Sequence, residues 1–202
     1  MRTKGLLIVV SGPSGAGKGT ICKELLNLRD DINISVSATT RQPRAGEEHG
    51  INYFFTPREE FEKGIGEGDF LEHAVVYDNL YGTPKGYVMD KINAGEDVLL
   101  EIDIQGALQV KERYPQGVFI FILPPSLDEL RKRIIGRGSE TEESFNTRFS
   151  SAFEEIKLVD HYDYFIVNDE VDKATDLMVS IIVAERNRVL GNVEEIIKEF
   201  KK

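Results

Sequence analysis

The sequence predicts an α/β fold in which helices cover both faces of a parallel sheet. Short apolar runs of strand length alternate with segments whose apolar residues recur at helical spacing. The first apolar run, residues 6–10, passes through a glycine-rich turn into one of these helical segments. A less regular stretch, residues 33–87, interrupts the alternation and indicates a lobe inserted into the sheet domain.

The first strand is predicted over Leu6–Val10, because this run is short, wholly apolar and ended by Ser11-Gly12-Pro13. The helix that follows begins at residue 17 or 18 and ends near residue 28. Its helical spacing rests on Ile21, Leu25, Leu26 and Leu28.

The irregular stretch contains pieces of both kinds of structure. A helix is predicted to begin at Pro57, with Thr56 as its N-cap and Glu59 at its third position. A second helix, residues 84–93, is predicted to end before Gly95. Short strands are predicted at 34–36, 53–55 and 70–76.

The alternation resumes near residue 98. Pro124-Pro125 ends one strand, Ser126 caps the next helix with Glu129 at its third position, and residues 137–143 read as a polar loop. The strands are predicted at 98–102, 118–123 and 164–167. The helices are predicted at 105–113, 127–135, 142–159, 171–190 and 193–200.

Composition narrows the class of protein. Hydrophobic residues make up 41% of the 202 residues, and the net charge of −10 argues against a nucleic-acid-binding surface. No apolar run approaches the roughly 20 residues that cross a bilayer, and residues 6–10 are too few for a signal peptide. A cytoplasmic chain starting at Met1, without membrane contact, is therefore expected. The lone Cys22 excludes an internal disulfide and predicts a small core residue.

The turn after the first strand has the spacing of a nucleoside triphosphate loop, and its strand–turn–helix context predicts a P-loop NTPase-type core that binds a nucleoside triphosphate. Glycines let backbone N–H groups converge on an anion, and a lysine reaches the β- and γ-phosphates. Gly19 stands where a hydroxyl residue is usual, so Mg²⁺ is expected to be held mostly by water and phosphate. The predicted ATP-binding loop comprises Gly12, Pro13, Ser14, Gly15, Ala16, Gly17, Lys18, Gly19 and Thr20.

Further motifs extend over almost the whole chain. Arginines gather in two short stretches of this acidic sequence, which indicates anion sites, with solvated helix faces as the alternative. In order and spacing the motifs resemble those of guanylate kinases over residues 5–188. They are Ser37–Glu47 with its Thr-Thr-Arg-Gln-Pro-Arg-Ala-Gly-Glu run, Asn52–Phe55, Phe70–Glu72, Tyr81–Thr83, Glu101–Gly106, Gly136–Thr141 and Val167–Asp169.

The resemblance implies three parts: a core (1–36, 89–124 and 159–202), a GMP-binding lobe (37–88) and a helical lid (125–158). It also implies transfer of the ATP γ-phosphoryl group to GMP, and to dGMP as a further acceptor. Mg²⁺ would accompany ATP, and no protein group would be a dedicated metal ligand. The implied partners are the two nucleotides alone.

The resemblance assigns roles residue by residue. Glu72 would read guanine, because one carboxylate accepts hydrogen bonds from N1–H and the exocyclic amine, whereas adenine offers an acceptor at N1. The implied GMP-binding residues are Ser37, Arg41, Arg44, Glu47, Tyr53, Glu72, Tyr81, Thr83 and Asp103. Asn168 and Asp169 would lie near the ATP adenine. The implied catalytic cations are Lys18, Arg41, Arg133, Arg137 and Arg148.

Alternatives remain at this point. From the residues alone, Glu101 and Asp103 fit equally a magnesium-facing pair or solvent-exposed acids. The chain as a whole also fits an inactive binding module of the same architecture, or a kinase of another phosphorylated small molecule. Retention of Lys18, Arg41 and Glu72 favours the active enzyme, since a binding module has no need of them.

Overall fold

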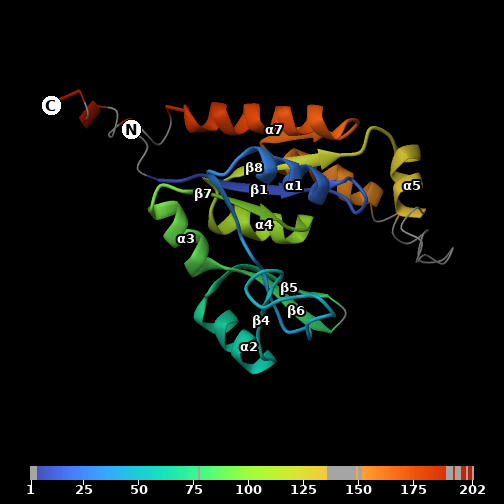
Figure 1. Cartoon of the computed structure of the whole chain (residues 1–202), viewed down its shortest axis with the longest axis vertical. Helices are drawn as coiled ribbons and strands as arrows, with labels where there is room; N and C mark the ends of the chain where they lie inside the picture. Colours follow the sequence, from blue (N-terminus) through green and yellow to red (C-terminus); the bar gives the residue numbers. More distant parts are fainter. Residues whose placement is uncertain are drawn as a thin grey trace.

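The computed structural model describes residues 4–76, 78–135, 149, 152–189, 193, 197, 198, 200 and 201. These residues form a larger sheet covered by helices, and a smaller sheet that lies below it with its own helix (Figure 1). Among the described residues, no helix is both long and apolar enough to span a membrane.

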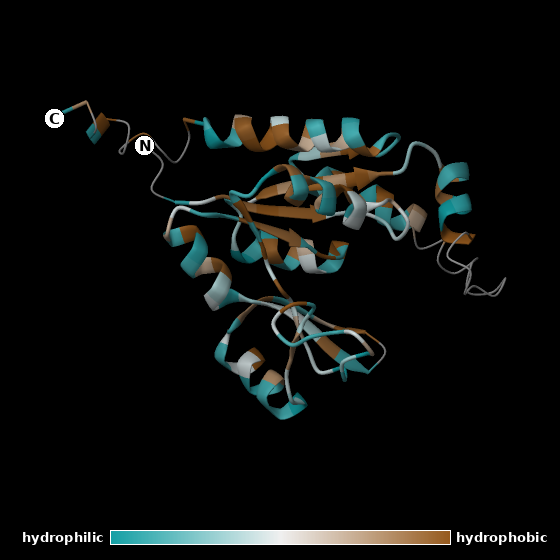
Figure 2. Cartoon of the chain, viewed as in Figure 1, coloured by the Kyte–Doolittle hydropathy of each residue, from teal (hydrophilic) through white to brown (hydrophobic). Residues whose placement is uncertain are grey.

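The larger sheet has five strands in the order β2-β7-β1-β8-β9, and every neighbouring pair is parallel. Its central strand β1 is buried along its whole length, as expected when both faces of a sheet are covered. Figure 2 shows these strands as the hydrophobic layer of the molecule. The strands are β1 (Leu7–Ser11), β2 (Ile32–Ile34), β7 (Asp97–Glu101), β8 (Val118–Leu123) and β9 (Tyr164–Val167).

Helices cover both faces of this sheet. On one face α1 (Lys18–Leu28) and α7 (Val171–Arg186) share a core cluster that includes Ile21 and Met178. On the other face α3 (Lys85–Asn93) and α4 (Ile104–Arg113) bury their apolar residues against the sheet. The helix α5 (Leu127–Ile135) follows β8, and residues 152–156 lead into the 3₁₀ turn η1 (Lys157–His161) before β9.

The smaller sheet has four strands in the order β4-β3-β6-β5. Its hydrophobic cluster centres on Phe61 of α2 (Arg58–Glu67), whose ring stacks on that of Phe70 at a centroid distance of 4.3 Å. The strands are β3 (Ala38–Thr39), β4 (Phe54–Phe55), β5 (Phe70–Val76) and β6 (Asn79–Pro84). The whole sheet lies between β2 and β7 in the sequence, although those two strands are neighbours in the larger sheet.

The predicted α/β fold with a parallel-sheet core is confirmed. Strands 70–76, 118–123 and 164–167 and helix 127–135 have the predicted bounds, and Ser126 Oγ accepts the Glu129 N–H at 3.1 Å. The strand predicted at 34–36 is wrong by two residues: it pairs with β7 at residues 32–34. The strand predicted at 98–102 runs over 97–101, and the predicted helix at 105–113 begins one residue earlier.

Other expectations were wrong for identifiable reasons. Thr56 does not cap α2, because its hydroxyl donates to the carbonyl of Phe54 at 3.2 Å and Pro57 precedes the helix. The long helix α7 ends at Arg186, where Asn187 leaves helical geometry. The helix predicted at 142–159 does not reach residue 159 as an α-helix, because residues 157–161 form a 3₁₀ turn. The loop predicted at 137–143 lies outside the described residues, as do residues 194–196 and 199 of the helix predicted at 193–200.

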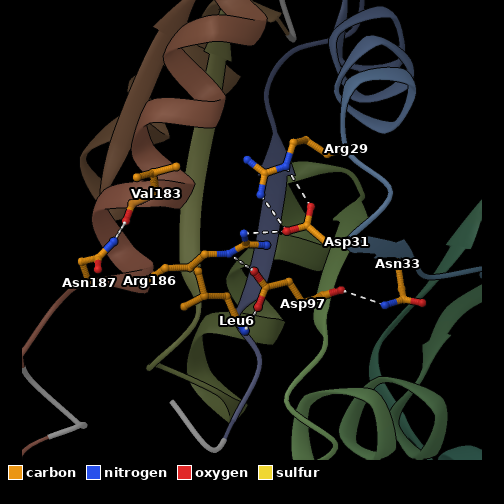
Figure 3. A network of polar contacts seen from close by, with 8 residues as sticks. All are labelled: Leu6, Arg29, Asp31, Asn33, Asp97, Val183, Arg186 and Asn187. Atoms are coloured by element: carbon orange, nitrogen blue, oxygen red, sulfur yellow. Dashed lines mark hydrogen bonds and ion pairs between the residues drawn. The ribbon is translucent and has the colours of Figure 1, made fainter. Parts of the chain in front are cut away.

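A buried carboxylate ties α7 to the sheet at the amino-terminal ends of its strands (Figure 3). Asp97 is 3% exposed; its Oδ1 accepts the Leu6 N–H at 2.7 Å and its Oδ2 accepts Arg186 Nε at 2.6 Å. Arg186 also donates to Asp31 at 2.7 Å, and Asp31 is paired with Arg29. The network thus joins α7 to β7 and to the segment between α1 and β2.

We expect Arg186→Met to lower the free energy of unfolding by about 2–3 kcal/mol, because it removes the ion pair of a buried carboxylate. Urea unfolding at pH 7 measures the change. Lys173→Met is the matched control on the same helix, since its pair with Glu170 is exposed and contributes about 0–1 kcal/mol. Equal losses in the two variants would contradict a structural role for the Asp97 network.

Candidate active site

Two pockets open at the carboxyl-terminal end of the larger sheet, where ligands of open α/β sheets bind. The first, which we name the loop pocket, has a volume of about 590 Å³ and is lined by Ser14, Gly15, Gly17, Lys18, Gly19, Thr20, Lys23 and Glu101. The second, the lobe pocket, has a volume of about 230 Å³. It is lined by Ser37, Tyr53, Glu72, Ala74, Val76, Tyr81, Gly82, Glu101, Ile102 and Asp103. Glu101, the last residue of β7, lines both pockets.

The loop between β1 and α1 fits closely against its neighbours. Gly12 has φ +145°, and a Cβ there would lie 2.3 Å from the carbonyl oxygen of Ile122 in β8. Gly17 has φ +93°, and a Cβ there would lie 2.2 Å from Asn168 Nδ2. Asn168 Nδ2 itself donates to the Ala16 carbonyl at 2.8 Å. Larger residues at either glycine would therefore displace the loop from the sheet.

Lys18 is held against the loop that it follows. Its Nζ donates to the carbonyl oxygens of Gly12 at 2.6 Å and Pro13 at 3.3 Å. Burial lowers the pKa of Lys18, while the negative charges of Glu101, Glu155 and Asp103 act in the opposite direction. The loop pocket thus combines a cation, a helix N-terminus and backbone donors, which together suit a polyphosphate.

Of the three arginines predicted in the lid, the structure describes Arg133. This residue of α5 lies beside the loop: its Nη1 is 3.9 Å from the position that a Cβ would take at Gly17. Its Nε donates to Glu129 at 3.1 Å and its Nη2 to the Asn168 carbonyl at 3.2 Å. Asp169 is exposed at the end of β9. Arg137 and Arg148 lie outside the described residues.

Glu72 is the buried acid of the lobe pocket. Its side chain is 6% exposed, and its Oε1 accepts the hydroxyl of Thr83 on the neighbouring strand at 2.7 Å. Burial raises the pKa of Glu72 to about 7, the bond from Thr83 lowers it, and the charge of Asp103 raises it further. Ser37 lies on the wall of the same pocket.

A cationic cluster stands at the rim of the lobe pocket. Glu47 accepts Arg41 Nη2 at 2.9 Å with one carboxylate oxygen and the backbone N–H of Arg44 at 2.7 Å with the other. Arg41 Nε donates to the hydroxyl of Tyr81 at 3.3 Å, and the guanidinium lies 5.5 Å from the centre of the Tyr53 ring. Arg41 is therefore held on three sides, whereas the Arg44 side chain is exposed.

A sequence model of guanylate kinases matches residues 4–185. The chain belongs to the guanylate kinase family. It is 59% identical to the guanylate kinase of Clostridioides difficile over 198 residues, which cover 98% of this chain and 97% of that relative. It is 62% identical to the guanylate kinase of Clostridium acetobutylicum over 189 residues, which cover 94% of this chain and 90% of that relative.

A solved structure agrees with this family assignment. The crystal structure of guanylate kinase from Anaplasma phagocytophilum superposes with a TM-score of 0.78 at 34% sequence identity, covering 98% of this chain and 96% of that one. A crystal structure of TT1252 from Thermus thermophilus, with a TM-score of 0.53 at 15% identity, shares the fold.

Two polar residues lie against the loop between β1 and α1 in positions that the sequence did not predict. Glu155 faces the loop: burial raises its pKa, and the charge of Lys18 and the N–H of Ser14 act against that rise. No sequence pattern singles it out, because it is one of several acids on its segment. Asn168 was expected near the adenine of ATP. Its side-chain amide instead donates a hydrogen bond to the backbone carbonyl of Ala16 in the loop.

We expect Glu72→Gln to stabilise the nucleotide-free protein at pH 8. Because the pKa of Glu72 is higher in the folded chain, at about 7, than its ordinary value of 4.5, the folded chain binds more protons between these values and stability falls as pH rises through this interval. Removing the charge should raise the free energy of unfolding at pH 8 by about 2 kcal/mol.

Urea unfolding at pH 5 and pH 8 measures this difference. Glu60→Gln, an exposed acid on α2, is the control and should change stability by less than about 0.5 kcal/mol at both values. A Glu72→Gln protein less stable than wild type at pH 8 would show that the carboxylate supports the fold.

Proposed function

We propose that this chain transfers the γ-phosphoryl group of ATP to GMP, giving ADP and GDP, and that dGMP is a further acceptor. The observation that supports the proposal is that Glu101 lines both the loop pocket and the lobe pocket. A loop that suits a polyphosphate therefore lies beside a pocket with a buried carboxylate. In-line phosphoryl transfer requires donor and acceptor phosphates to meet in this way.

The lobe pocket suits guanine. The ionised Glu72 carboxylate has two oxygens for the adjacent N1–H and exocyclic amine, and Thr83 fixes one of them through its hydroxyl. Adenine would place an acceptor against this acceptor, which leaves a buried group unpaired and is strongly unfavourable. Ser37 and Asp103, which line the pocket, are proposed to complete the contacts to the base.

The acceptor phosphate is proposed to bind at the cationic rim. Arg41 is already oriented by Glu47, and with Arg44 it offers planar groups that bond phosphate oxygens in pairs. Tyr53 and Tyr81 would add hydroxyl donors. The arginines offset the repulsion between two polyanions as they approach, and no general base is needed because the attacking group is an ionised phosphate oxygen.

On the donor side, the loop amides and Lys18 are proposed to hold the triphosphate of ATP, with Asn168 and Asp169 near its adenine. Arg133, together with Arg137 and Arg148, would stabilise charge on the transferred group when the lid closes and excludes water. This assigns residues 37–88 to a GMP-binding lobe, 125–158 to a lid and the remaining ranges to the core. We place the reaction in the cytoplasm, where both nucleotides are available.

The residues around Gly19 bear on how Mg²⁺ would be held. Gly19 has no hydroxyl, and a Cβ there would lie 3.2 Å from Glu101 Oε1. Within the described residues, no cluster of three or more His, Cys, Asp or Glu side chains is arranged for a metal ion. This set fits Mg²⁺ bound chiefly through triphosphate and water, with Glu101 and Thr20 as the nearby protein groups. When bound, Mg²⁺ neutralises charge on the β- and γ-phosphates.

The function is tested by ADP release from ATP and Mg²⁺ with GMP, dGMP, AMP, UMP or CMP as acceptor. We expect turnover with GMP and dGMP and a kcat/KM for AMP lower by about 10⁴-fold, because AMP leaves buried polar groups unpaired. Fast turnover with another acceptor would overturn the guanine assignment. Binding of GMP without any turnover would favour the inactive-module alternative.

We expect Lys18→Ala to lower kcat by about 10²–10³-fold, as when a donor aimed at the developing charge is removed. Steady-state kinetics with GMP measure the loss, and circular dichroism verifies the fold. Lys63→Ala, an exposed lysine on α2, is the control for removing one positive charge. Near-normal turnover of Lys18→Ala would contradict the assignment of the loop pocket to the donor.

A further inference from the structure

The strand that carries Glu72 is irregular and lies at the edge of its sheet. Among the strands that the structure describes, β5 has β6 as its one neighbour. Phe70 pairs with Pro84 and Glu72 with Thr83, so two residues of β5 advance against one of β6. This β-bulge redirects the side chains around it, and Phe70, Leu71 and Glu72 are buried in succession.

The free edge of β5 is occupied by side chains of α4 in the larger domain. Arg113 Nη1 donates to the carbonyls of Phe70 at 3.0 Å and Leu71 at 2.8 Å. Gln109 Oε1 accepts the N–H of His73 at 3.2 Å, and its Nε2 donates to the His73 carbonyl at 3.0 Å. The backbone is therefore held immediately before and immediately after Glu72.

The first turn of α4 touches the carboxylate itself. A Cβ at Gly106 would lie 3.0 Å from Glu72 Oε2, so the absence of a side chain leaves room for that oxygen. The Gly106 N–H donates to Asp103 Oδ1 at 2.7 Å, which caps the helix and fixes this turn. Gly106, Gln109 and Arg113 are spaced by three and four residues and so share one face of α4.

Apolar packing does not fill the space between α4 and β5 completely. A hollow of about 620 Å³ lies beside β5, and Phe70, Leu71, His73 and Arg113 are among the residues that line it. Leu71 packs against Ala107 and Val110 of α4, and beside the hollow the polar side chains of α4 add a second restraint on the bulge.

We propose that Gln109 and Arg113 are positioning residues, and Gly106 a spacing residue, which together set the Glu72 carboxylate for guanine from helix α4. The proposal rests on the assignment of Glu72 to the base of GMP. None of the three touches the base in this scheme; they act through the backbone and carboxylate of Glu72. Base specificity then depends on the helix that leads out of β7, as well as on the lobe.

The test compares kcat/KM for GMP with that for IMP, whose base keeps N1–H and lacks the exocyclic amine. The GMP/IMP ratio reports the second hydrogen bond to Glu72, which requires correct placement of the carboxylate. The variants are Gln109→Met, Arg113→Met and Gly106→Ala. Glu112→Gln, an exposed residue of the same helix, is the control.

We expect each of the three variants to lower the GMP/IMP ratio by about tenfold, the effect of weakening one hydrogen bond to a charged group, with KM for ATP unchanged. Arg113→Lys should recover part of the ratio because it restores a donor. Gly106→Ala is informative because alanine favours a helix more than glycine, so weakening of α4 cannot explain its loss. Combined with Glu72→Gln, the three substitutions should have no further effect on the ratio.

Two results would overturn the inference. One is a fall in kcat/KM that is equal for GMP and IMP, which would mean that α4 only stabilises the lobe. The other is a fall in the ratio that persists undiminished in the Glu72→Gln background. If the wild-type protein phosphorylates neither nucleotide, the proposed function fails instead; isothermal titration of GMP and IMP onto the same variants then tests the positioning of Glu72 directly.

Discussion

Gly12 follows the central strand β1 and lies so close to the carbonyl of Ile122 that no side chain would fit between them. This contact fixes where the chain turns at the end of the sheet, and with it the direction of the loop amides and the first residue of α1. Asn168, at the end of β9, supports the other half of the loop through Ala16. The shape of the loop between β1 and α1 therefore depends on three parallel strands, β1, β8 and β9.

An acidic chain must gather its cations locally to bind two polyanions. The structure does so by pairing: Arg41 is held by Glu47, and Arg133 by Glu129 and a backbone carbonyl. Under the roles proposed for these arginines, each pairing restricts a long side chain before nucleotide binds, so less conformational entropy is lost on binding.

The larger sheet could be predicted from sequence because its strands are apolar runs bounded by turn residues. β8 and β9 have this form, and their predicted bounds are correct. The strand β3 was missed because it spans two residues, too few for a periodic pattern. β6 was missed because its glycine, threonine and proline resemble a loop.

Some residues of the candidate site could likewise be named from the sequence, and others could not. The motif at Lys18 and the residues around Arg41 and Glu72 could be named from sequence, since each lies in a local pattern. The contribution of Gln109 and Arg113 could not, because it depends on a bulge and on a helix–strand contact between distant segments. Short-range periodicity contains no information about such contacts.

The order of strands has a consequence for how such a protein changes over evolutionary time. β2 and β7 are adjacent in the larger sheet, yet the smaller sheet and α2 lie between them in the chain. The inserted segment thus leaves the domain and returns to it at neighbouring strands. Its length and contents can vary while the two strands keep their pairing, so mutation and selection can remodel the inserted sheet without rebuilding the larger one.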